Sequence, residues 1–127
     1  MAMKHAQSGE VIRLLSAAPL PDLRSQALVS TPSLEVMRLV LKAGHVVPSH
    51  AVAGPVTIHC LQGVIEVQVE DCWQTLHGNE LMYLAEGVEH ALQVIADTVT
   101  LVTIQRLPHG TGRGGSPGAI GSSSTGE

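Results

Sequence analysis

The feature that most constrains this chain is the strict alternation of apolar and polar residues over Ile65–Glu70. A period of two is typical of a β-strand with one buried and one exposed face, because successive side chains point to opposite faces. Similar short segments, separated by turn signals, lie at about Leu34–Lys42, Thr57–Leu61, Trp73–His77, Leu81–Leu84, His90–Ile95 and Thr98–Gln105. No segment has a helical period, so the sequence predicts an all-β fold, an antiparallel sandwich or jelly-roll barrel.

Composition divides the 127 residues into three zones within one domain. Residues 1–32 contain three prolines and predict an N-terminal arm across the barrel, with a short strand or helical turn at Val11–Leu15. Residues 33–107 hold nearly all strand signals and predict the barrel. Residues 108–127 carry seven of the 13 glycines and predict a disordered tail. With no phenylalanine, one tryptophan and one tyrosine, the core is expected to be aliphatic.

Charge and cysteine content narrow the classes of partner and compartment. The formal net charge of −4 argues against binding to nucleic acid or to an anionic membrane surface. No apolar run approaches the roughly 20 residues of a membrane helix. Two cysteines form no disulfide framework, and charges recur too often in Met1–Leu15 for a signal peptide. We therefore expect a cytoplasmic protein in a reducing compartment.

Two stretches of the sequence carry motifs. The residues from Gly44 to Gly63 resemble the first cupin motif, G(X)5HXH(X)3-4E(X)6G, in both glycines, in the first histidine, His50, and in every spacing. The residues from Asn79 to His90 resemble the second cupin motif, G(X)5PXG(X)2H(X)3N. The resemblance implies a small single-domain cupin, an RmlC-like jelly roll also called a double-stranded β-helix.

The sequence departs from these motifs at positions where the motifs have polar, functional side chains. In metal-binding cupins, the resemblance implies three histidines and one glutamate as ligands. Here the second histidine position is Val52, the glutamate position is Val56, and the closing asparagine position of the second motif is Val94. His50 and His90 alone remain as ligands from the two motifs.

A third metal ligand is expected from Cys60 if the site holds a metal at all. Cys60 comes four residues after Val56, so alternation places both side chains on the inward face. Two histidines and a thiolate would suit a divalent ion, with zinc, iron, manganese, nickel and copper as candidates. The alternative is that Cys60 is a small apolar core residue, as buried free cysteines usually are.

Three functions follow as hypotheses. The first is a small-molecule-binding cupin, with His50 and His90 as polar anchors in an apolar pocket. The second is a metal-dependent enzyme, dioxygenase-like or isomerase-like. The third is a structural or regulatory module that forms a homodimer through the apolar outer faces of Leu34–Leu41 and Leu81–Leu84. The pocket of the first hypothesis is expected to be lined by Met37, Val52, Val56, Ile58, Met82 and Val94.

Overall fold

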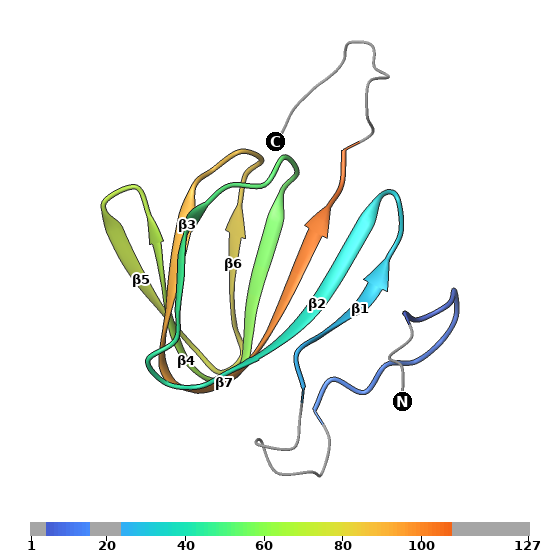
Figure 1. Ribbon diagram of the computed structural model, residues 1–127, viewed down its shortest axis with the longest axis horizontal. Coiled ribbons are helices and arrows are strands. Elements are labelled where there is room, and N and C mark those ends of the chain that lie inside the picture. Colours follow the sequence, from blue (N-terminus) through green and yellow to red (C-terminus); the bar gives the residue numbers. More distant parts are fainter. Residues whose placement is uncertain (1–4, 16–23, 108–127) are drawn as a thin grey trace.

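Two long strands, β4 (Val56–Val69) and β7 (His90–Gln105), pair with each other and form the frame of the barrel (Figure 1). The computed structural model describes residues 5–15 and 24–107. The other strands are β1 (Gln26–Ser30), β2 (Leu34–Leu41), β3 (Val46–His50), β5 (Cys72–His77) and β6 (Glu80–Leu84). Every pairing is antiparallel, which confirms the predicted all-β antiparallel fold. Within the described ranges there is no helix that could cross a membrane.

Both long strands bend in the middle, so each contributes to two walls of the barrel. The first half of β4 pairs with β6, and its second half pairs with β5. The second half of β7 pairs with β2, and its first half pairs with β3. Both ends of β4 and of β7 therefore lie at the same end of the molecule, opposite the bends (Figure 1). We call this end the rim.

The bends occur where the sequence predicted turns between separate strands. The register between β4 and β7 shifts between Cys60 and Ile65. Gly63 lies inside this irregularity with φ +97°, and a Cβ atom there would overlap the carbonyl oxygen of Asp97. Glycine is required at this position because only glycine combines a positive φ with so close a backbone approach. The predicted breaks near Gly63 and Asp97 are thus bends within continuous strands.

Two strands were not expected. β3 contains Pro48 and, among the described strands, pairs only with β7. Such an edge strand tolerates a residue that cannot donate a backbone hydrogen bond. β1 falls within the predicted arm and pairs with β2. The predicted strand or helical turn at Val11–Leu15 is wrong, because these residues have neither conformation.

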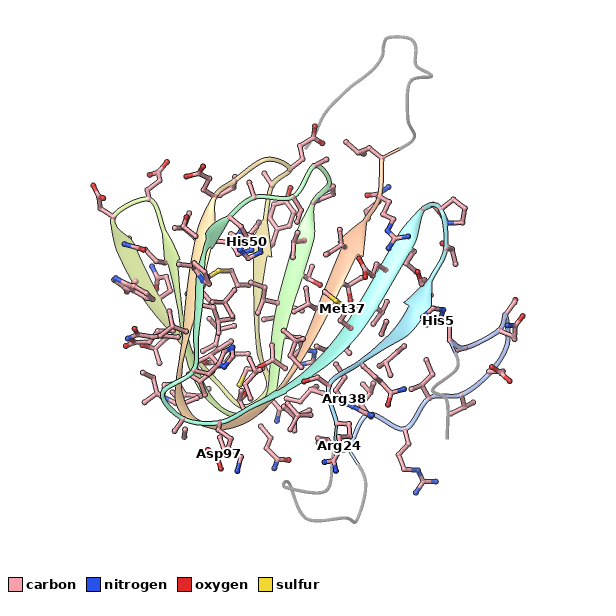
Figure 2. All side chains as sticks on the ribbon, viewed as in Figure 1. His5, Arg24, Met37, Arg38, His50 and Asp97 are labelled. Carbon is pink, nitrogen blue, oxygen red and sulfur yellow. The ribbon has the colours of Figure 1, made fainter. Side chains whose placement is uncertain are left out.

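Arg38 ties the N-terminal residues to the outer face of the barrel. Its buried guanidinium donates hydrogen bonds to the carbonyl oxygens of Arg13, Leu14 and Arg24 and to the side-chain oxygen of Gln26. These acceptors are neutral, and they satisfy polar N–H groups that would be costly to bury without partners. Figure 2 shows Arg38 and Arg24 beside the N-terminal segment.

The core lies between the two walls and is aliphatic, as predicted. Its aliphatic members and one cysteine come mainly from the two long strands: Val56, Ile58, Cys60, Ile65, Val67, Leu76, Leu84, Leu92, Val94 and Val102. The two large aromatic residues, Trp73 and Tyr83, are exposed on the surface. The glycine-rich segment 108–127 lies outside the described residues.

Candidate histidine site

His50 and His90 face each other across the β3–β7 pair at the rim. They are direct partners in the strand register, and their ring centroids lie 4.5 Å apart with the ring planes inclined by 54°. His90 is only 6% exposed, whereas His50 is exposed because β3 is an edge strand. Figure 2 shows His50 near the rim. The structure thus brings together the two histidines that the sequence motifs singled out.

Each ring is held by a carbonyl group two residues earlier in the chain. Nδ1 of His50 lies 3.0 Å from the carbonyl oxygen of Pro48, and Nδ1 of His90 lies 3.1 Å from that of Val88. A carbonyl oxygen only accepts hydrogen bonds, so Nδ1 is the protonated nitrogen in each neutral ring. Both Nε2 atoms then keep their lone pairs. The pair can accept hydrogen bonds from a ligand or offer two nitrogen ligands to a metal ion.

The structure does not bring Cys60 to this pair. Cys60 is fully buried near the bend, where its sulfur lies 3.5 Å from the carbonyl oxygen of Gly63 and 3.8 Å from the hydroxyl of Thr98. Burial raises the pKa of the Cys60 thiol, which favours the protonated form over the thiolate that binds metals. Cys60 therefore behaves here as a core residue.

The residues present do not fit a metal centre of the usual catalytic kind. Such centres use about three protein ligands. Among residues 5–15 and 24–107, no group of three or more His, Cys, Asp or Glu side chains could hold a metal ion. The valines at positions 52, 56 and 94 offer no ligand atoms.

Cys72, to which the sequence assigned no role, lies in the same cross-strand row as the histidines. Val69 pairs with Cys72 on one side and with His90 on the other, and His90 pairs with His50. Neighbouring strands lie about 4.8 Å apart, so Cys72 and His90 are separated by roughly 10 Å. The thiol of Cys72 is free and exposed. The short turn after Val69 is a sequence signal for the pairing of Val69 with Cys72. No local pattern in the sequence indicates the pairing of Val69 with His90.

The predicted pocket residues lie within or against the core. Val56, Ile58 and Val94 belong to the buried cluster, and Met37, Val52 and Met82 pack against it. Val52 also lines a cavity of about 540 Å³ at the rim. A ligand pocket formed by all six residues stays a prediction.

Three turn residues in the two motif stretches have a positive φ. Gly44 and Gly87 have φ values of +91° and +77°. Asn79, which replaces the first glycine of the second motif, has φ +72°. Asparagine tolerates this left-handed conformation better than most residues, so the substitution preserves the turn.

Comparison with known proteins identifies the fold. The sequence matches no protein-family model and no curated protein. Its structure is similar to that of a conserved protein of unknown function from Streptococcus pyogenes, with a TM-score of 0.66 and 18% identity over 84% of this chain and 98% of the other. A cupin superfamily protein from Desulfitobacterium hafniense gives a TM-score of 0.66 and 16% identity over 81% and 95% of the two chains.

A further similar structure is an RmlC-like cupin with a double-stranded β-helix fold from Methanocaldococcus jannaschii. It gives a TM-score of 0.65 and 17% identity, over 80% of this chain and 94% of the other. At these identities the similarity concerns the fold and leaves the activity open.

Proposed function

Since this chain has the cupin fold, we propose that it binds a small molecule at the rim of the barrel through His50 and His90. The observation that carries the proposal is the fixed orientation of both rings by the carbonyl groups of Pro48 and Val88. Two Nε2 acceptors, one on a buried ring and one on an exposed ring, are suited to a ligand that carries hydrogen-bond donors. Val69, the cross-strand neighbour of His90, is a partly buried apolar residue and offers apolar surface for the rest of such a ligand.

A fragment screen by ligand-observed NMR tests this proposal. The fragments carry amide, amine or hydroxyl donors on an apolar body, and each hit is repeated with the His50→Ala, His90→Ala double variant. The matched control is His45→Ala, because His45 is an exposed histidine in the loop before β3. We expect hits that the double variant loses and the control keeps. A folded double variant that retains every hit would overturn the proposal.

The metal-dependent enzyme is the alternative that the cupin resemblance suggests. It requires a ligand beyond the two histidines, and the described residues offer no three-ligand group. Elemental analysis of protein purified without a chelator or a metal-affinity tag distinguishes the two. Near-stoichiometric metal that disappears in the His50→Ala, His90→Ala variant would replace the binding proposal by this alternative.

A second candidate function is dimerisation through the outer face of β6. Leu81 and Tyr83 are 58% and 61% exposed there, and their partners on β4 are His59 and Thr57. None of these four side chains carries a fixed charge, so a second copy of the chain could cover them without opposing like charges, despite the net charge of −4. We also expect a cytoplasmic location, which suits two free cysteines.

Sedimentation velocity of wild type and of a Leu81→Glu variant tests the dimer. The control is Val46→Glu, which introduces the same charge at an exposed apolar position on β3. We expect a dimer for wild type and for the control, and a monomer for Leu81→Glu. A monomeric wild type at micromolar concentration would remove this candidate.

A further inference from the structure

A second candidate site lies at the rim, apart from the histidine pair. It is a cavity of about 540 Å³, bounded by the turn before β2, the loop between β3 and β4, and the end of β7. Neither His50 nor His90 lines it. Its volume falls in the range of about 300–1,000 Å³ that is common for small-molecule sites.

The wall of this cavity contains a carboxylate at an inward position of the barrel. Glu35 pairs with Ile104 in the strand register, and Ile104 pairs in turn with Val56 of the core. The next inward residues of β2, Met37 and Leu39, are apolar and pack against the core. Glu35 therefore interrupts an otherwise apolar inner face just where that face borders the cavity.

Arg106 is held beside this carboxylate by three contacts. One guanidinium nitrogen lies 3.2 Å from Oε1 of Glu35. The other terminal nitrogen donates to the carbonyl oxygen of Thr31 at 2.8 Å, and the backbone N–H donates to the carbonyl oxygen of Ser33 at 2.9 Å. The positive and negative groups thus have fixed positions next to each other at the cavity wall.

The ion pair keeps unused bonding capacity. Oε2 of Glu35 accepts no hydrogen bond from the described residues, and Arg106 uses only part of its five N–H donors. The side chains of Glu35 and Arg106 are 25% and 37% exposed, so a ligand can reach them. Val52, Ile104 and Leu107 add apolar surface to the same cavity.

We propose that this cavity binds a small zwitterion with an aliphatic group, in the manner of an α-amino acid. Its ammonium group would donate to Oε2 of Glu35, its carboxylate would accept from Arg106, and its aliphatic group would contact Val52 and Ile104. Adjacent opposite charges on the ligand complement the adjacent charges of the protein, so all four charges alternate. A ligand with only one charge would satisfy one partner and leave the other unmatched.

Titration of the uniformly ¹⁵N-labelled full chain with three matched probes tests the inference. L-norleucine is the zwitterion, hexanoate lacks its ammonium group, and pentylamine lacks its carboxylate. We expect saturable shifts of the backbone amides of Ala53, Gly54 and Arg106 with norleucine, and at least tenfold weaker binding of the other two probes. No saturable shift with norleucine, or equal binding of all three probes, would overturn the inference.

Variants assign the binding to the ion pair. Glu35→Gln and Arg106→Gln should each weaken norleucine binding at least tenfold. Glu66→Gln is the matched control, because the Glu66 carboxylate accepts a hydrogen bond from Gln93 away from the cavity lining. Unchanged norleucine binding in folded Glu35→Gln protein would contradict the inference. If that variant does not fold, the titration of wild type with the three probes still tests the inference. The His50→Ala, His90→Ala variant should bind norleucine normally, which separates this site from the proposed histidine site.

Discussion

The rings of His50 and His90 are direct cross-strand neighbours, and both are fixed through Nδ1 by the carbonyl group two residues earlier. The same local hydrogen bond is thus made on two strands, β3 and β7, that are far apart in the sequence. As a result, each ring keeps a lone pair at Nε2. NMR spectroscopy can detect this protonation pattern.

We predict that both histidines are Nδ1–H tautomers when neutral. Nitrogen-15 NMR of the imidazole rings at alkaline pH identifies the protonated nitrogen of each ring. His45, whose ring makes no hydrogen bond with the described residues, is the internal control and should show a mixture of tautomers. A protonated Nε2 in neutral His50 or His90 would contradict the orientation on which the binding proposal rests.

Gly54→Ala is predicted to destabilise the barrel by about 1–3 kcal/mol or more, because overpacking against backbone forces the chain to move. A Cβ at position 54 would overlap the carbonyl oxygen of Gln105, which is backbone and cannot rotate away. Gly78→Ala is the control, since its Cβ would meet its nearest neighbour, the carbonyl oxygen of Leu61, at 3.4 Å. Chemical denaturation of both variants measures the difference, and equal stability would show that the loop at Gly54 adjusts freely.

Thr98→Val is predicted to cost about 1–3 kcal/mol, because it removes a buried hydroxyl and leaves the buried hydroxyl of Thr100 without this partner. The Thr98 hydroxyl donates to the carbonyl oxygen of Gln62 at 2.8 Å, so the hydroxyl of Thr100, 2.9 Å away, donates to it in turn. Both threonines are buried. Thr75→Val makes the same chemical change at an exposed position of β5 and should alter the free energy of unfolding, measured by chemical denaturation, by less than about 0.5 kcal/mol.

The two cysteines are predicted to differ in reactivity. A thiol reagent such as DTNB at mildly alkaline pH should modify Cys72 rapidly and Cys60 only on unfolding, because Cys72 is exposed and Cys60 is buried. A Cys72→Ser variant should show no fast-reacting thiol. Two fast thiols in the folded wild type would mean that the bend opens readily.

The buried thiol also predicts the direction of a pH dependence. Burial raises the pKa of Cys60, so the folded chain keeps this proton at a pH where the unfolded chain begins to lose it. The contribution of this pKa difference to the free energy of unfolding is fully present below the ordinary thiol pKa. It is lost as the pH rises through the raised pKa of Cys60 in the folded chain. Between neutral and alkaline pH, the free energy of unfolding should therefore fall more for wild type than for Cys60→Ala.

Alternation in the sequence predicted the strands well where one face is buried, as in Ile65–Glu70. It missed β3, because Pro48 and four exposed positions out of five hide any pattern there. The sequence also predicted two separate strands in place of β4 and two in place of β7. The reason is that Gly63 and Asp97 are turn-forming residues, and in the sequence a bend within a strand resembles a turn between strands. Pairing between the two long strands keeps each of them continuous. A local sequence pattern does not indicate this pairing, because the paired residues are far apart in the chain.

The candidate site was predicted in part for a similar reason. Motif spacing correctly brought His50 and His90 together. Alternation placed Cys60 correctly on the inward face, but four residues of strand measure about 13 Å, which carries its side chain from the rim toward the bend. The ion pair of Glu35 and Arg106 joins the two ends of the barrel sequence, so no local pattern indicated it.

The position of β7 at the end of the barrel sequence has a consequence for synthesis on the ribosome. Within the described part of the chain, β3 pairs only with β7, and β2 pairs along its whole length with β7, up to Gln105. A nascent chain that stops before β7 can form the β1–β2 and β4–β5 hairpins, yet it cannot close either wall. The apolar faces of these hairpins therefore lack their native partners until nearly the whole barrel has been translated, and it is during this interval that the chain is most prone to aggregation.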